Sequence, residues 1–322
     1  MDRFVVVTPV YEDAEAAGQL FRELSSKYSG GVHVIAVDDG SVRHPLDVSS
    51  IAAAGLSGAV IRLRRNVGHQ RAIAIGLCYV AERLTDETVV VMDSDGEDAP
   101  GTVGDLLQLL NAENTHVAVA QRKSRVETLR FRLFYVLYKW LFKMLTGRRI
   151  YFGNFVAMRS SAVLRLTAMQ ELWIHFPASV LISRLPIRNI SLDRGRRYAG
   201  HSQMNFVALA LHGLKSLMVF AEDVLVRVCI ACACLAAASV IAGISAVTLK
   251  LIGIATPGWA SVSLGILVLM FLQTGALTLM TLMLTGVVRS GRIVESDYKA
   301  YILDVVTVGT SPWSERTALN GD

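Results

Sequence analysis

Short apolar runs alternate with longer amphipathic segments over residues 1–204. The apolar runs are rich in Val and Ile and are bounded by Gly, Pro, Asp or Ser, which predicts strands. The predicted strands are Phe4–Val10, Val32–Val37, Val60–Leu63, Val89–Met92, His116–Ala120, Ile150–Met158 and Ile187–Leu192. Helices are predicted over Glu12–Lys27, Gly68–Leu84 and Thr102–Asn111, and from Ser160 or Ser161 onward. This alternation predicts an α/β domain with a mostly parallel sheet and helices on both faces.

Two uncharged intervals follow this domain, Val228–Leu249 and Leu251–Val288. Each is long enough for the roughly 20 apolar residues that a membrane-spanning helix requires. Pro257 and Gly258 lie between the apolar segments and supply a turn. The pattern therefore predicts a transmembrane hairpin of two helices over residues 224–288. It also accounts for a hydrophobic content of 52%, which is high for a soluble domain.

Basic residues near the ends of the two predicted spans indicate their orientation. Lys215 and Arg227 precede the first span, Arg289 and Arg292 follow the second, and the connecting loop contains only Lys250. Because basic residues accumulate on the cytoplasmic side, both long flanks are expected to face the cytoplasm. The chain is then a multi-pass protein of the cell membrane, with residues 289–322 as a cytoplasmic tail in which no motif is recognised. No nucleic-acid partner is expected.

Two further segments are predicted to lie at the membrane surface. In the segment 126–146, with Arg125 just before it, Arg132, Lys139 and Lys143 fall on one helical face, among Leu, Phe, Tyr and Trp140. A basic, aromatic-rich amphipathic helix is typical of the headgroup layer. The alternative is a helix that packs within the domain and has a solvated basic edge. A second interfacial helix is predicted over residues 205–223, directly before the first span.

Acidic side chains follow two of the predicted strands. Asp38 and Asp39 come after Val32–Val37, and Asp93 and Asp95 come after Val89–Met92. Ligands in parallel sheets bind beyond the carboxyl ends of the strands, so these side chains are expected to converge on one crevice. Paired carboxylates suit a hard divalent cation such as Mg²⁺ or Mn²⁺, which also binds phosphates of a substrate. The alternative is a solvated acidic turn after a core strand.

A basic loop follows the last predicted strand, over Arg194–Met204. Arg194, Arg196, Arg197 and His201 lie close together there around glycine residues. Beside a cation and a phosphate, such side chains favour charge-assisted contacts to an anion.

Taken together, these motifs resemble a known family. The motifs are Thr8-Pro9-Val10-Tyr11-Glu12, Val37-Asp38-Asp39-Gly40-Ser41, Arg65-Asn66-Val67-Gly68-His69, Asp93-Ser94-Asp95 with Asp98 and Pro100, Arg122 with Arg125, and Arg197 with Gly200 and Ser202. In this order, and followed by a membrane hairpin, they are similar to those of the membrane-anchored family 2 glycosyltransferases that load a sugar onto a polyprenyl phosphate. Dolichyl-phosphate mannose synthases and undecaprenyl-phosphate glucosyl- and aminoarabinosyl-transferases belong to that family.

The resemblance implies a GT-A domain and a metal-dependent, inverting glycosyltransferase. It would move a sugar from a nucleotide diphosphate sugar, with UDP favoured and GDP as the alternative, to a polyprenyl phosphate at the cytoplasmic face. Assembly into a homo-oligomer stays open. The implied nucleotide-sugar residues are Pro9, Tyr11, Glu12, Asp38, Asp39, Asn66, Asp93, Ser94 and Asp95. Asp93 and Asp95 would bind Mg²⁺ or Mn²⁺, and Asp95 and Arg197 would be catalytic. The acceptor phosphate would meet Arg122, Arg125, Arg197 and Ser202.

Three positions depart from the family pattern. Glu12 stands where relatives often have Asn, Gln203 stands where a Lys is common, and the segment around Asn154 has no carboxylate where many relatives have a proposed catalytic base. The last departure does not exclude transfer. A phosphate monoester has a second pKa near 6, so at neutral pH its oxygen is already a nucleophile and needs no base.

Two other functions remain open at this stage. A processive polysaccharide synthase normally has a Gln-X-X-Arg-Trp motif and more spans, whereas Gln170–Trp173 lacks the Arg. A catalytically degenerate membrane scaffold would fit the altered positions, but the intact pair of Asp93 and Asp95 argues against it.

Overall fold

The computed structural model describes residues 3–28, 30–83, 87–122, 129–198, 206–254, 258–290 and 297–309. These residues fall into two compact units. The first contains the described residues within Met1–Arg132, Ile150–Val219 and Glu295–Asp322, and the second those within Leu133–Arg149 and Phe220–Val294.

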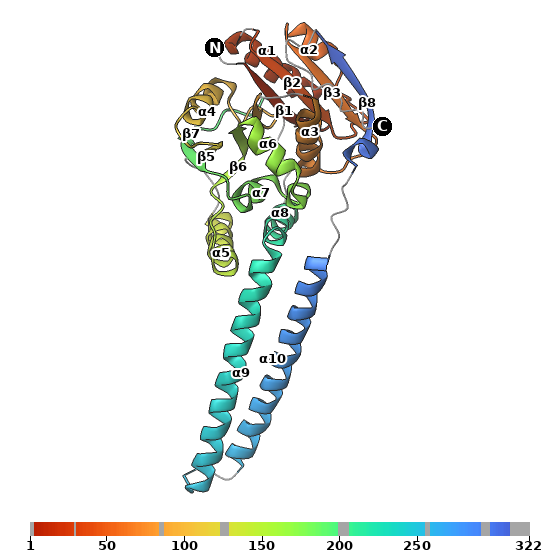
Figure 1. Cartoon of the computed structure of the whole chain (residues 1–322). Coiled ribbons are helices and arrows are strands. Elements are labelled where there is room, and N and C mark those ends of the chain that lie inside the picture. The colour runs from red at the N-terminus through yellow and green to blue at the C-terminus, as the bar shows by residue number, and fades with distance from the viewer. Residues whose placement is uncertain are drawn as a thin grey trace. The chain divides into compact units, whose positions relative to one another are not determined.

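The first unit is built on one sheet of eight strands (Figure 1), in the order β7-β5-β6-β4-β1-β2-β3-β8. The strands are β1 (Phe4–Val10), β2 (Val32–Asp38), β3 (Ser57–Leu63), β4 (Thr88–Val91), β5 (Val117–Arg122), β6 (Phe152–Met158), β7 (Ile187–Leu192) and β8 (Ile302–Val308). β1 pairs in parallel with β2 and β4, β2 with β3, and β5 with β7. β6 and β8 run antiparallel to their neighbours. The prediction of a mostly parallel α/β sheet is confirmed.

Helices cover both faces of this sheet. α3 (His69–Arg83), α6 (Ser160–Thr167) and α7 (Phe176–Ile182) pack on one face, together with the short turn η2 (Gln170–Trp173). α1 (Ala14–Tyr28), α2 (Ser49–Ala53) and α4 (Val103–Leu110), with the turn η1 (Pro100–Thr102), cover the other. β1 and β2 are buried at every residue, as expected for strands covered on both sides.

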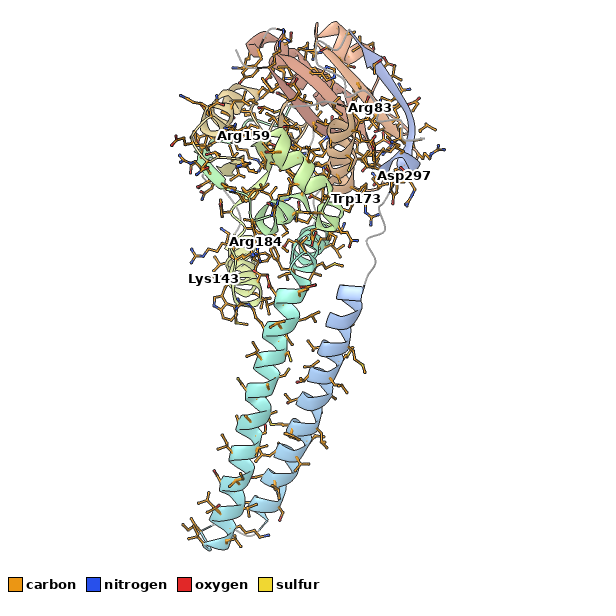
Figure 2. All side chains as sticks on the ribbon, viewed as in Figure 1. Arg83, Lys143, Arg159, Trp173, Arg184 and Asp297 are labelled. Atoms are coloured by element: carbon orange, nitrogen blue, oxygen red, sulfur yellow. The ribbon has the colours of Figure 1, made fainter. Side chains whose placement is uncertain are left out.

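The eighth strand comes from the far end of the chain. The hydropathy pattern predicts no element after Val288, whereas η3 (Tyr298–Tyr301) and β8 add an antiparallel edge to β3, from Gly58 opposite Val308 to Leu63 opposite Ile302. Side chains hold η3 in place. The Tyr298 hydroxyl donates to the Glu82 carboxylate at 2.7 Å, and the ring of Tyr301 lies 6.1 Å from that of Trp173. Figure 2 labels Trp173 on η2 and Asp297 just before η3.

The second unit contains two long helices, α9 (Ala221–Leu251) and α10 (Trp259–Ser290). Ala221–Leu251 and Ser261–Thr281 are long and apolar enough to cross a membrane, by length and composition, and little of either is buried. Small residues on α9, Cys232, Ser239, Gly243 and Ala246, are its buried positions. The coarse prediction of two long apolar helices is confirmed.

The two predicted interfacial segments form helices with exposed apolar side chains. In the second unit, the last part of α5 (Leu129–Thr146) exposes Val136, Trp140 and Met144 at four-residue intervals, beside Lys139 and Lys143. Its opposite side holds Phe142, whose ring packs edge-on against Phe220 at 5.7 Å. In the first unit, α8 (Phe206–Met218) exposes Leu211, Leu214 and Met218.

Candidate active site

The candidate site lies where neighbouring parallel strands end. β4 ends at Val91, and Asp93, Ser94 and Asp95 follow at once in a tight turn. β1 and β2 lie next to β4 in the sheet, so residues that follow these strands reach the same edge. The sheet therefore brings together the nucleotide-sugar residues predicted from the sequence, since each lies at the carboxyl end of β1, β2, β3 or β4.

The turn after β4 is held by its own carboxylates. The backbone N–H of Asp93 donates to the buried Asp98 carboxylate at 3.0 Å, and the N–H of Glu97 donates to Asp95 Oδ1 at 2.9 Å. Gly96 has φ 87°, a conformation that side chains rarely adopt. A Cβ at Gly96 would come within 2.8 Å of the Tyr198 ring. Glycine at position 96 thus lets another loop approach the turn closely.

That second loop, residues 193–198, lies directly on the turn. The N–H of Gly195 donates to the Glu97 carbonyl and the N–H of Tyr198 to the Asp95 carbonyl, both at 2.9 Å. A Cβ at Gly195 would collide with the Gly96 carbonyl oxygen, so only glycine fits there. Backbone hydrogen bonds therefore hold together two loops that are far apart in the sequence.

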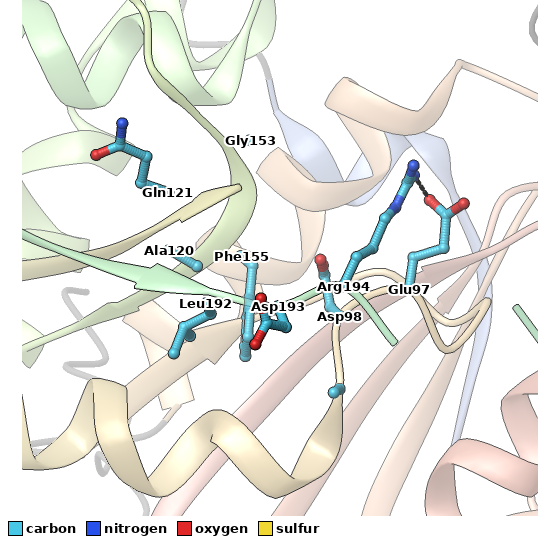
Figure 3. A pocket seen from close by; sticks show the side chains of 10 residues that line it. Glu97, Asp98, Ala120, Gln121, Gly153, Phe155, Leu192, Asp193 and Arg194 are labelled. Atoms are coloured by element: carbon cyan, nitrogen blue, oxygen red, sulfur yellow. Dashed lines mark ion pairs between the residues drawn. The ribbon is translucent and has the colours of Figure 1, made fainter. Parts of the chain in front are cut away.

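Two arginine side chains from the second loop form ion pairs with the acidic turn. Arg197 Nη2 lies 2.7 Å from Asp95 Oδ2 and 3.4 Å from Glu97 Oε1. Arg194 forms an ion pair with Glu97, drawn as a dashed line in Figure 3. The predicted catalytic residues Asp95 and Arg197 are thus brought into direct contact.

Two pockets flank this pair of loops. The first has an empty volume of about 320 Å³ (Figure 3). It is lined by Glu97, Asp98, Ala99, Ala120, Gln121, Gly153, Phe155, Leu192, Asp193 and Arg194. Its three carboxylates outnumber its one guanidinium, which disfavours a phosphate there. The second opening, of about 610 Å³, contains Arg196 and Arg197 and one carboxylate, Glu23, and therefore suits an anion better.

At the ends of β1 and β2, three carboxylates bind backbone N–H groups. Glu12 accepts from Val42, Arg43 and His44 at 2.9–3.2 Å, and these bonds, chiefly that from Val42, lower its pKa. Asp38 accepts from Ser41 and Leu46, and Asp39 accepts from Val67 and Gly68 at 2.7 and 3.0 Å. Burial raises the pKa of Asp39, and the two N–H bonds oppose that rise. These carboxylates fix the loops that surround the site.

The remaining nucleotide-sugar residues differ in exposure. Pro9 is buried within β1, and Ser94 is buried beside Asp93. The Tyr11 side chain is 49% exposed, and Asn66 is also exposed, so both are accessible to a ligand.

The acceptor-phosphate residues are only partly described. Arg122 is the last residue of β5, while Arg125 and Ser202 lie outside the described residues, as do His201 and Gln203. Of the predicted acceptor-phosphate set, only the Arg197 side chain has described contacts.

One contact of a predicted site residue was not predicted from the sequence. His69, at the start of α3, places Nε2 3.0 Å from Asp93 Oδ1, and Asn154 on β6 donates to the same oxygen at 3.2 Å. Burial lowers the pKa of His69, but the charge and hydrogen bond of Asp93 outweigh it, and the net pKa is raised. The position of His69 after Gly68 gave no signal for this contact, because the partner is 24 residues away in sequence.

The two carboxylates fit a divalent cation that is shared with a substrate. Among the described residues, no three His, Cys, Asp or Glu side chains are grouped to hold a metal ion. Asp93 and Asp95 offer the oxygen ligands that Mg²⁺ and Mn²⁺ prefer, and such cations usually take further ligands from substrate phosphates. Asp95 Oδ2 is paired with Arg197, so a cation at that oxygen would lie close to the guanidinium.

Several solved structures are similar to this chain. Glucosyl-3-phosphoglycerate synthase from Mycobacterium tuberculosis, in complex with Mn²⁺, UDP and glucosyl-3-phosphoglycerate, is 19% identical with a TM-score of 0.48, covering 70% of this chain and 80% of that one. Its complex with Mg²⁺ and UDP gives 16% identity and a TM-score of 0.49, covering 69% and 79%. A further mycobacterial protein gives 20% identity and a TM-score of 0.46, covering 70% and 74%. No curated protein matches the chain.

A family model gives the identity of the domain. The model described as glycosyl transferase family 2 matches residues 5–173, which is more than half of the 322 residues. The match spans the chain from β1 to η2 and includes the carboxylates after β2 and β4 as well as Asn154. The chain therefore belongs to glycosyl transferase family 2 and is a glycosyltransferase.

Proposed function

We propose that this glycosyltransferase moves a sugar from a nucleotide diphosphate sugar, preferably a UDP-sugar, to the phosphate of a polyprenyl phosphate. The observation that supports this acceptor most directly is the joining of a family 2 domain to two long apolar helices with little buried surface. The exposed apolar residues of α5 beside Lys139 and Lys143 support it further, because a basic amphipathic surface suits lipid headgroups.

In this proposal, residues 1–204 form the catalytic domain, 205–223 an interfacial helix, 224–288 the membrane hairpin and 289–322 a cytoplasmic tail. Basic residues flank the hairpin on the side of the catalytic domain, which supports a reaction at the cytoplasmic face.

The reaction makes its largest electrostatic demand at the leaving group. Breaking the bond between sugar and nucleotide releases a diphosphate, so charge must be stabilised there. Asp93 and Asp95 would hold Mg²⁺ or Mn²⁺, which supplies Lewis-acid stabilisation of that charge. Arg197, already within hydrogen-bond distance of Asp95, adds a guanidinium that can pair with phosphate oxygens.

The acceptor needs no proton removed before it attacks. A phosphate monoester is mostly dianionic at neutral pH, so its oxygen attacks the anomeric carbon directly. A single displacement of this kind inverts the anomeric configuration. The amide at Asn154, in place of a carboxylate, is compatible with it.

One experiment tests the acceptor and the donor together. The full chain, reconstituted in lipid, is incubated with a panel of nucleotide sugars, undecaprenyl or dolichyl phosphate, and Mn²⁺. The expected result is a lipid-linked sugar, identified by mass, whose anomeric configuration is opposite to that of the donor. Release of nucleotide without any lipid-linked product, or transfer only to a soluble acceptor such as phosphoglycerate, would overturn the proposed acceptor.

A further inference from the structure

A chain of amide side chains connects the buried start of α7 to Asp93. The backbone N–H of Phe176 donates to Gln70 Oε1 at 2.7 Å, and Gln70 Nε2 donates to Asn154 Oδ1 at 3.1 Å. Asn154 Nδ2 then lies 3.2 Å from Asp93 Oδ1 and 2.9 Å from His69 Nε2. Gln70 is only 7% exposed, so its amide has no ready alternative partner in water.

The first member of this chain fixes the direction of the bonds that lead from Phe176 through Gln70 and Asn154 to Asp93. A backbone N–H can only donate, so the group of Gln70 that faces Phe176 must be its carbonyl oxygen. The Gln70 NH₂ group must then face Asn154, which can accept it only through Oδ1. Asn154 consequently turns its own NH₂ group toward Asp93. The orientation of both amides follows from hydrogen-bond chemistry and not from the similar shapes of the O and N atoms.

We infer that Gln70 is a positioning residue, which acts through Asn154 to direct an N–H donor at the Asp93 carboxylate. An ionised carboxylate accepts hydrogen bonds only, so it is held best by neighbours that are obliged to donate. The amide at Asn154, where many related enzymes have a carboxylate, therefore has a role of its own: it orients Asp93. The catalytic consequence rests on the proposed function, whereas the hydrogen-bond direction does not.

The substitution Gln70→Glu reverses the direction of the hydrogen bonds between these side chains with little change in side-chain shape. Because burial raises the pKa of a carboxyl group, the variant is compared with the parent at pH about 9, where the new side chain is ionised. One oxygen of the ionised carboxylate still accepts from Phe176, but the other has no proton to donate to Asn154 Oδ1. Asn154 must rotate to donate to that carboxylate, and its carbonyl oxygen then faces Asp93 Oδ1, from which Nδ2 is now 3.2 Å away. Two acceptors opposed at this distance repel each other, and the rotated carbonyl also competes with Asp93 for the N–H of His69 Nε2, so Asp93 is expected to move away from its position.

A matched variant separates this effect from simple loss of packing. Gln70→Met removes both side-chain hydrogen bonds but lets Asn154 keep its NH₂ group toward Asp93. Met leaves the buried Phe176 N–H unpaired, which destabilises the fold. The expected order of kcat is therefore parent, then Gln70→Met, then Gln70→Glu, with the Gln70→Glu variant about 10-fold or more below the parent. Gln70→Glu keeps an acceptor for the Phe176 N–H, and Gln70→Met does not. If Gln70 were important only for stability, Gln70→Met would therefore be the more damaging substitution.

A second readout needs no substrate. In an Asp93→Asn background, the NH₂ group of the new side chain can donate to the rotated Asn154 carbonyl. Gln70→Glu is then expected to lower Tm by about 4 °C in the parent background and by less than half of that in the Asp93→Asn background. Gln70→Met is expected to lower Tm equally in both backgrounds.

The two readouts fail in different ways. Equal Tm losses for Gln70→Glu in both backgrounds, or parental kcat in the Gln70→Glu variant, would overturn the positioning role. A smaller Tm loss for Gln70→Glu in the Asp93→Asn background, in a protein that transfers no sugar to any lipid phosphate, would support the hydrogen bonds from Gln70 to Asp93. The same result would contradict the proposed acceptor.

Discussion

Single carboxylates at the site differ in what their oxygens contact, and this separates their roles. Asp38 and Asp39 are both buried, and each accepts two backbone N–H groups, so they shape loops. Asp95 has one oxygen on a backbone N–H and the other on the Arg197 side chain, which can change its rotamer more easily than a backbone group can move. Asp95 can therefore exchange a partner for a cation more easily than Asp38 or Asp39 can.

The substitution Asp95→Asn tests this role. It keeps the acceptor for the Glu97 N–H but removes the charge, so kcat is expected to fall about 100-fold or more, with loss of the response to Mn²⁺. Nucleotide release is measured against Mn²⁺ concentration, with EDTA-treated parent beside it. Asp105→Asn, on the exposed side of α4, is the matched control and should retain parental activity. Full turnover of the Asp95→Asn variant, or of the parent in EDTA, would contradict the cation site.

His33 gives a prediction for the pH dependence of stability. It is 6% exposed on β2, its Nδ1 lies 3.0 Å from the Ser57 hydroxyl, and burial lowers its pKa from 6.5 to about 4. Between these two pH values the unfolded chain binds the proton and the folded chain does not. The free energy of unfolding should therefore fall by up to about 3 kcal/mol as pH falls from 6.5 to 4, and the contribution of His33 should be complete above 6.5.

Urea unfolding of the detergent-solubilised chain across this pH range measures the effect. His33→Gln retains a hydrogen-bond partner for Ser57 but does not titrate, so its midpoint should change less over the same range. Identical pH profiles for the two proteins would show that other groups are responsible.

The prediction from sequence was most successful for residues that follow strands. Asp93 and Asp95 were identified because a run of Val residues predicts a strand that ends directly before them. Ligands of parallel sheets bind beyond the carboxyl ends of the strands, which is where these two side chains lie. The contacts of Asp93 with His69 and Asn154 were not predicted. They depend on the register of α3 and β6 against β4, which no local pattern encodes.

At the scale of elements, α5 combines apolar and basic side chains on its exposed surface. Trp140 is 59% exposed and lies between Val136 and Met144, next to Lys139 and Lys143. If this surface lies in the headgroup layer, Trp140 should be quenched by lipids brominated in their acyl chains and protected from iodide in water. The test uses the full chain with its other three tryptophans changed to Phe.

The basic residues give the control for this experiment. Lys139→Gln together with Lys143→Gln should reduce the extra quenching seen in anionic vesicles, because each lysine near an anionic surface contributes about 1 kcal/mol. Iodide quenching that is independent of lipid would favour the alternative of a helix with a solvated basic edge.

β8 shows how the partner of a strand can be hidden from sequence analysis. Ile302–Val308 is itself a run with strong strand propensity, Ile-Leu-Asp-Val-Val-Thr-Val. Its partner β3 ends at Leu63, far earlier in the chain, and both long helices lie between the two strands. The run itself could have been predicted as a strand, but its place beside β3 could not, because local periodicity does not reveal which strand a segment pairs with.

At the scale of the whole molecule, β8 constrains how the chain is threaded. The sheet takes seven of its strands from before α9 and its last strand from after α10. If α9 and α10 cross a membrane, the chain must leave and return on the same side, as the basic flanks of the hairpin also predict.

Tags at the two ends of the chain test this threading. Tags at the N-terminus and the C-terminus should be cleaved by protease in the same population of vesicles, inverted or right-side-out. A tag placed between Lys250 and Trp259 should be cleaved only in the other population. Opposite accessibility of the two terminal tags would contradict the pairing of β8 with β3 in the membrane-inserted protein.

The pairing of β3 with β8 also sets an order of events during synthesis. After Leu63 the ribosome must make the rest of the chain up to Val308, including both long helices, before β8 exists. At roughly 5–20 residues per second this takes on the order of 10–50 s. Throughout that time β3 is an open edge with unpaired N–H and C=O groups, the kind of surface that recruits other strands. The nascent chain therefore completes its sheet only after both long helices have been made, and a chain that terminates early keeps that edge exposed.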